Sequence, residues 1–119
     1  MTLTTAKIGV IGAGAWGTAL AQVLSEGQDE LLLWAREPEV VDQINRTHEN
    51  ISFLPGHRLR DNISATMDLE AMAACDVLLL VTPAQHLRAT LQALPDSSAA
   101  LILCCKGIEA RSRLLLSEV

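Results

Sequence analysis

Short, almost wholly apolar runs alternate along the chain with longer stretches in which apolar residues recur every three or four positions. The apolar runs predict strands buried on both faces, and the wider spacing predicts amphipathic helices. Five strands are predicted, at residues 7–11, 31–34, 63–66, 77–81 and 101–104. This alternation of strand and helix predicts an α/β fold with a parallel sheet covered by helices on both faces.

Boundary signals place the helices between these strands. A helix that includes Trp16 and Leu24 ends before Gly27, and Pro38 suits the first turn of a second helix. Asp68 is placed to cap a short helix over 69–74, and another helix is predicted over about 85–94. Residues 46–62 are predicted as a long loop, and residues 111–119 have helical composition. Right-handed crossovers then give a Rossmann-type doubly wound sheet with strand order 3-2-1-4-5.

A glycine motif, Gly12-Ala13-Gly14-Ala15-Trp16-Gly17, follows the first predicted strand and opens the first predicted helix. This is the context in which G-x-G-x-x-G binds a dinucleotide. Gly12 permits the tight turn, Gly14 lets a pyrophosphate approach the backbone, and Gly17 allows close packing of the helix. The backbone N–H groups of Ala15 and Trp16 would face the phosphates at the positive end of the helix dipole.

Two simpler interpretations of this motif stay open. The glycines could form a turn that binds no ligand. The Trp16 ring, taken singly, is more often a core or interdomain packing group than a ligand contact.

The residue after the second predicted strand is Ala35 or Arg36, where dinucleotide domains usually carry an acid that holds the adenosine ribose. A guanidinium there can pair with a 2′-phosphate and stack on adenine. We therefore expect NADPH to be accepted at least as well as NADH. The alternative is a surface arginine paired with Glu37 or Glu39.

Two more candidates follow the fourth and fifth predicted strands. Ligands of doubly wound sheets lie beyond the carboxyl ends of the strands. Pro83 would fix the backbone near a nicotinamide ribose, or would merely start the next helix. Lys106 would lie at the rim of the same crevice and could hold a substrate phosphate or carbonyl, or could be an ordinary solvated lysine.

Composition narrows the functional class. Half of the 119 residues are hydrophobic and 19% are charged, which argues against disorder. The net charge of −5 argues against nucleic-acid binding and against a polybasic membrane anchor. The glycine-rich segment ends in Ala19-Leu20-Ala21, which mimics a signal-peptidase site, but four glycines oppose an apolar helix there. The longest apolar run, 99–105, is too short for a membrane span.

The cysteine and histidine pattern predicts a reduced, cytoplasmic protein without a metal site. The chain has three cysteines, which cannot all pair with one another: Cys75, Cys104 and Cys105. No Cys/His spacing typical of a metal site is present. The histidines are predicted as loop or surface residues: His48, His57 and His86. No serine lies in a nucleophile motif.

Five segments together are similar to one known family. They are Gly12–Gly17, Leu33-Trp34-Ala35-Arg36, Asn50 with Phe53-Leu54-Pro55-Gly56, Val81-Thr82-Pro83-Ala84-Gln85 and Lys106-Gly107-Ile108-Glu109. In order and spacing they resemble the bacterial NAD(P)-dependent glycerol-3-phosphate dehydrogenases, over nearly the whole chain. Ala15 departs from the pattern, since many members carry serine there. The backbone N–H is kept.

The resemblance implies reversible hydride transfer between NAD(P)H and C2 of dihydroxyacetone phosphate, giving sn-glycerol 3-phosphate for phospholipid synthesis. It implies that Ala15, Trp16 and Arg36 contact the cofactor and that Lys106 contacts both cofactor and substrate. The general acid/base lysine is expected beyond residue 119, in a helical substrate domain. Residues 1–119 would then be the cofactor-binding domain alone, without a catalytic residue and inactive by itself.

An isolated domain of this kind would leave the fifth strand as an apolar edge. We expect either that two chains pair along 101–104 or that residues 111–119 cover it. Two alternative functions stay open: a dinucleotide-sensing module, and a related two-domain dehydrogenase acting on a phosphorylated sugar acid or an acyl-thioester.

Overall fold

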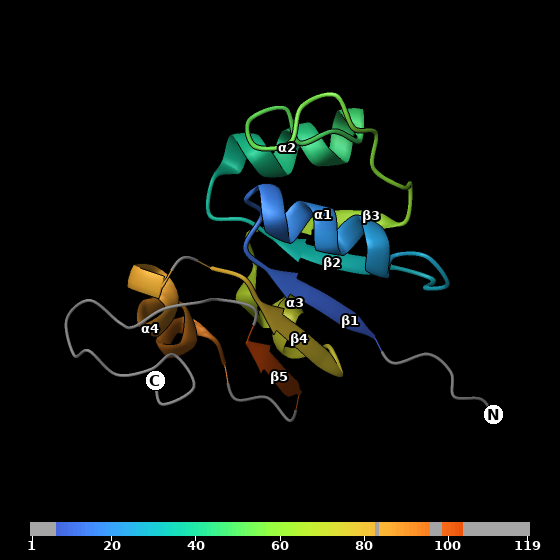
Figure 1. Ribbon diagram of the computed structural model, residues 1–119. Helices are drawn as coiled ribbons and strands as arrows, with labels where there is room; N and C mark the ends of the chain where they lie inside the picture. The colour runs from blue at the N-terminus through green and yellow to red at the C-terminus, as the bar shows by residue number, and fades with distance from the viewer. Residues whose placement is uncertain (1–6, 83, 96–98, 104–119) are drawn as a thin grey trace.

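The computed structural model describes residues 7–82, 84–95 and 99–103 of the chain. Strands and helices alternate, as Figure 1 shows. The strands are β1 (Ile8–Ile11), β2 (Leu31–Trp34), β3 (Ile63–Thr66), β4 (Val77–Leu80) and β5 (Ala100–Leu103). The helices are α1 (Ala15–Leu24), α2 (Pro38–Thr47), α3 (Leu69–Ala73) and α4 (Ala84–Ala93).

The five strands form one parallel sheet in the order β3-β2-β1-β4-β5. The predicted fold class and strand order are therefore confirmed. β1 pairs with β2 from Ile8 opposite Leu31, and with β4 from Ile8 opposite Val77. The order reverses between β1 and β4, so the carboxyl ends of these two strands mark the switch point where doubly wound sheets bind ligands.

Side-chain alternation along the strands builds two separate cores, one on each face of the sheet. Val10, Leu33 and Leu79 point to the face covered by α1 and α2. Their chain neighbours Ile11, Trp34 and Leu80 point to the opposite face, with residues of α3 and α4. Both faces are buried, which explains why these strands read as continuous apolar runs rather than as alternating patterns.

Helix boundaries agree with the sequence to within a residue or two, for reasons visible in the structure. Pro38 opens α2, and α2 ends at Thr47 before its C-cap His48, which adopts a left-handed conformation with φ of 56°. Asp68 caps α3 as expected, because its Oδ1 accepts a hydrogen bond of 2.9 Å from the Glu70 N–H. The predicted loop 46–62 begins slightly later, after Thr47, and contains a single bridge between Asn50 and Leu54.

β5 is the edge of the sheet, and its Leu101 and Ile102 are about half exposed. The segment 111–119, which was expected as a possible cover for this edge, lies outside the described residues. The cover, by that segment or by a second chain, therefore stays a prediction.

A matched pair of leucines tests the arrangement of the two cores. Leu33 is wholly buried in the centre of β2, whereas Leu101 is half exposed on the edge strand. We expect Leu33→Ala to lower the free energy of unfolding by about 2–5 kcal/mol. Leu101→Ala should lower it by less than about 1 kcal/mol. Urea denaturation followed by circular dichroism measures both, and equal losses would contradict this assignment of core and edge.

Candidate functional site

The site is built around a glycine turn at the carboxyl end of β1. Gly12 has φ of +122°, a conformation that side chains rarely adopt, and its N–H donates to the Trp34 carbonyl at 3.0 Å. A Cβ on Gly12 would lie 2.9 Å from the Thr82 nitrogen. The turn is therefore held against the ends of both β2 and β4, and only glycine fits at its first position.

Positions 17 and 14 are occupied by glycine for different structural reasons. A Cβ on Gly17 would collide with the carbonyl oxygen of Gly12 and would contact Val81. Gly17 thus lets α1 pack directly on the turn. A Cβ on Gly14 would meet nothing within 4 Å. No packing within the described residues requires glycine there, so the space in front of Gly14 is open for a ligand.

The N-terminus of α1 lies at this open space with the first backbone N–H groups of the helix. Gly14 is the N-cap and has no side chain to cap the helix. The first helical hydrogen bond runs from the Thr18 N–H to the Gly14 carbonyl, at 2.9 Å. The N–H groups of Ala15, Trp16 and Gly17 precede it and have no intrahelical acceptor. With the positive end of the helix dipole, they form a site suited to an anion.

Trp16 is 61% exposed. The interpretation of its ring as a core residue of this domain is therefore wrong. Its side chain is available at the mouth of the turn, for a ligand or for another part of the protein.

Asn50 holds the glycine turn from the loop after α2, and no local spacing in the sequence predicts this contact. Its side chain is wholly buried, and its Nδ2 donates to the Ala13 carbonyl and to Thr18 Oγ1, each at 2.8 Å. Its Oδ1 accepts from the Phe53 N–H at 3.2 Å. One side chain therefore ties the loop after α2 to both the glycine turn and the first turn of α1.

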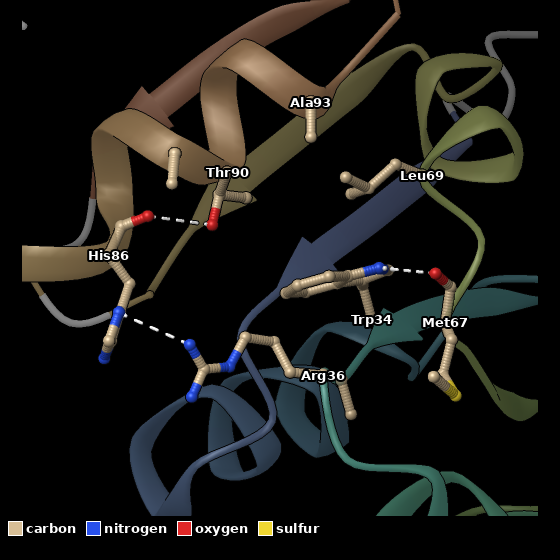
Figure 2. A pocket seen from close by; sticks show the side chains of 9 residues that line it. Trp34, Arg36, Met67, Leu69, His86, Thr90 and Ala93 are labelled. Atoms are coloured by element: carbon tan, nitrogen blue, oxygen red, sulfur yellow. Dashed lines mark hydrogen bonds between the residues drawn. The ribbon is translucent and has the colours of Figure 1, made fainter.

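A second feature is a pocket of about 450 Å³ beyond the carboxyl end of β2, shown in Figure 2. Trp34 forms part of its wall, with the indole Nε1 donating to the Met67 carbonyl at 3.0 Å. Leu69, Thr90 and Ala93 line it from α3 and α4. The pocket combines an aromatic and aliphatic wall with a cationic side chain, Arg36, at its edge.

Arg36 is exposed and extends across the pocket toward α4. Its Nη1 lies 3.3 Å from Nδ1 of His86. Within the described part of the chain, no ion pair joins it to Glu37 or Glu39, so the alternative of a simple surface ion pair is wrong.

His86 is the residue that sequence reasoning missed. It was predicted as a loop or surface residue, but it is a half-buried residue of α4 that lines the pocket. No local spacing links it to Arg36, because they are fifty positions apart. Only the topology indicates that the two residues lie close together. Arg36 follows β2 and His86 follows β4, and these two strands flank β1.

Two other predicted site residues, Pro83 and Lys106, lie outside the described residues. The neighbour Thr82 is buried, and its Oγ1 donates to the Ile11 carbonyl at 3.3 Å. This contact joins the end of β4 to the end of β1. The backbone that leads into Pro83 therefore leaves the sheet directly beside the glycine turn.

Other candidate chemistry is weak in the described part of the chain. Cys75 is buried, and its burial raises the pKa of the thiol, so it is a packing residue rather than a reactive one. No group of three His, Cys, Asp or Glu side chains is placed to hold a metal ion among the described residues. No described helix has the length and apolar character that crossing a membrane requires.

The strand order, the glycine turn at the switch point and the uncapped start of α1 define the class of Rossmann-type dinucleotide-binding domains. Residues 7–119 match the family model described as NAD-dependent glycerol-3-phosphate dehydrogenase N-terminus. The chain belongs to this family.

Relatives of known name agree with this assignment. The chain is 52% identical, over its full length, to glycerol-3-phosphate dehydrogenase [NAD(P)+] of Parvibaculum lavamentivorans, of which it covers 37%. It is 53% identical over 97% of its length to the Novosphingobium aromaticivorans protein of the same name, of which it covers 35%. The chain thus spans little more than a third of the length of these relatives.

Solved structures show the same fold. Glycerol-3-phosphate dehydrogenase from Coxiella burnetii superimposes with a TM-score of 0.84 at 30% identity, over 96% of this chain and 36% of that one. The enzyme from Saccharomyces cerevisiae gives a TM-score of 0.82 at 33% identity, over 97% of this chain and 38% of that one.

The contacts of Asn50 generate a stability prediction. In Asn50→Asp, a buried carboxylate would replace the amide donor that faces the Ala13 carbonyl. We expect the free energy of unfolding to fall by about 2–4 kcal/mol, because a buried charge without a donor partner is costly. Ser52→Ala, an exposed change in the same loop, should cost less than about 0.5 kcal/mol. Urea denaturation compares the two, and equal stability would contradict the role given to Asn50.

Proposed function

We propose that this chain binds NADPH or NADH, with the diphosphate at the N-terminus of α1. The observation that carries the proposal is the open space in front of Gly14, bordered by the backbone N–H groups of Ala15 and Trp16. Gly12 and Gly17 keep the turn and the helix in the positions that expose these groups. An anion there meets several N–H donors and a favourable dipole, in a space that the described residues leave open.

The rest of the nucleotide would follow the carboxyl edge of the sheet. The pocket beside Trp34 has the apolar wall that an adenine needs, and Arg36 supplies a cation for the adenosine phosphate or for stacking. Pro83 and Lys106 are assigned to the nicotinamide end on the strength of their positions after β4 and β5. Trp16, exposed at the turn, is assigned to the cofactor as well.

We further propose that the chain, residues 1–119, is the cofactor-binding domain of a glycerol-3-phosphate dehydrogenase. When bound, the reduced nicotinamide supplies a hydride for C2 of dihydroxyacetone phosphate, giving sn-glycerol 3-phosphate. This chain orients the nucleotide through its backbone cradle, and Lys106 is assigned to the substrate phosphate or carbonyl. The general acid/base and the rest of the substrate site are assigned to the part of the relatives that has no counterpart in these residues.

The cellular setting follows from this proposal. The product is a precursor of phospholipids, and the proposed location is the cytoplasm. A reduced, buried thiol at Cys75 is compatible with that compartment.

Gly14→Ala tests the cradle without disturbing the fold. The added methyl group meets no atom of the described residues but would occupy the space assigned to the diphosphate. We expect the affinity for NADPH, measured by calorimetric titration of the chain, to fall at least about tenfold, or ~1.4 kcal/mol. The free energy of unfolding should change by less than about 1 kcal/mol.

Ala15→Ser is the matched control, because it adds atoms at the next position while keeping the backbone N–H. Its affinity for NADPH should stay within about threefold of the unsubstituted chain. Unchanged binding by Gly14→Ala, or no binding of NADPH and NADH by the unsubstituted chain, would contradict the proposed function.

Arg36→Ala tests the adenosine end of the site. Loss of a charge-assisted contact to the 2′-phosphate should weaken NADPH about tenfold to thirtyfold and NADH less than about threefold. Arg46→Ala, which removes an exposed arginine paired with Asp42 on α2, should leave both affinities unchanged. An equal loss for both nucleotides in Arg36→Ala would show that Arg36 does not read the 2′-phosphate.

A further inference from the structure

Arg36 and His86 converge from two different elements on the mouth of one pocket. Arg36 follows β2, His86 lies in the first turn of α4, and Figure 2 shows the two side chains directed toward each other. The distance from Arg36 Nη1 to His86 Nδ1 is 3.3 Å. Both side chains retain access to solvent, so a ligand can reach them.

A guanidinium has only donors, so a hydrogen bond from Arg36 Nη1 requires His86 Nδ1 as its acceptor. That bond forms only in the tautomer whose ring proton lies on Nε2. If Nδ1 took up a second proton, two cations would face each other, and the arrangement would be stable only with an anion between or beside them.

Among the described residues, no carboxylate lines the pocket to supply that anion. Of the nine residues that line it, Arg36 and His86 are the charged or titratable ones. The nearby acidic residues Glu37, Asp68 and Glu70, as well as Arg88 on α4, are not among its lining residues. A doubly charged ligand phosphate is therefore the group that this pair of side chains fits.

We propose that His86 determines specificity for the 2′-phosphate of the nucleotide, by taking up a proton when that phosphate binds and holding it together with Arg36. The proposal rests on the proposed function, since it assigns the adenosine end of the same nucleotide. The proton comes from solvent to Nδ1, and the Nη1–Nδ1 hydrogen bond is exchanged for two charge-assisted contacts to phosphate oxygens.

The pH dependence follows from this linkage. Histidine changes charge in the range between pH 5 and 8, and a bound dianion favours its protonated form. Binding of a 2′-phosphorylated nucleotide thus consumes protons, so its affinity falls as the pH rises. A nucleotide with a free 2′-hydroxyl brings no such dianion and should show no matching change. Phosphate monoesters take up a proton themselves near about pH 6, so the informative range lies above that value.

The test is calorimetric titration of the whole chain with NADPH and NADH at about pH 6.5, 7.5 and 8.5, with adenosine 2′,5′-bisphosphate and AMP as probes that lack the nicotinamide. The ratio of NADPH to NADH affinity should fall about threefold to tenfold across this range. Titrations in buffers of different ionisation enthalpy should show that binding of NADPH takes up a larger fraction of a proton than binding of NADH does. The bisphosphate should repeat both effects, and AMP should show neither.

Variants of His86 separate charge from packing. His86→Asn keeps an acceptor near the Nδ1 position but cannot be protonated, so its affinity ratio should be independent of pH and equal to the wild-type ratio at high pH. His86→Lys should keep the high ratio up to about pH 8.5, because its cation persists. His57→Asn, at an exposed histidine away from the pocket, should behave like the unsubstituted chain.

A pH-independent ratio in the unsubstituted chain, or the same pH profile in His86→Asn, would overturn the inference while leaving nucleotide binding intact. Absence of binding of NADPH and NADH at every pH would overturn the proposed function, and this inference with it.

Discussion

The packing of α1 against the glycine turn is the constraint on which the rest of the site depends. Gly17 can lie against the Gly12 carbonyl only because Gly17 carries no side chain. Gly12 lies close to Val81 and Thr82 and adopts a backbone conformation that favours glycine. This contact starts α1 at the carboxyl ends of β1 and β4. The first N–H groups of the helix consequently open into free space at the switch point of the sheet, where a ligand can use them.

The surrounding fold holds this constraint from several sides. The sheet buries apolar side chains on both faces, so the ends of β1, β2 and β4 are fixed relative to one another. Asn50 then joins the turn to the loop after α2 through buried hydrogen bonds. Because these bonds are made inside the protein, the polar groups on the outer side of the turn remain available. The same arrangement therefore makes the turn rigid on its buried side and leaves the N–H donors accessible on its outer side.

The strands and the glycine turn could be predicted because local pattern determines them, and the strand order followed from the right-handed crossovers of alternating strands and helices. Buried strands are continuous apolar runs, Gly12 adopts a backbone conformation that favours glycine, and Gly17 packs on the nearby Gly12 carbonyl. Asn50 and His86 could not be assigned in this way, since their partners lie 37 and 50 positions away. A lone histidine carries no sequence signal for such a partner. The exposure of Trp16 likewise depends on which groups the fold brings near it, and not on its spacing in the helix.

Backbone amide NMR of the uniformly 15N-labelled chain tests the central claim most directly. Addition of NADPH should shift the amide resonances of Ala15, Trp16 and Gly17 in a saturable way, and ADP, which retains a diphosphate, should shift the same three. Resonances at the opposite end of α1 should move far less. If NADPH saturates the chain while these three resonances stay unchanged, the nucleotide binds elsewhere and the account of the glycine turn is wrong.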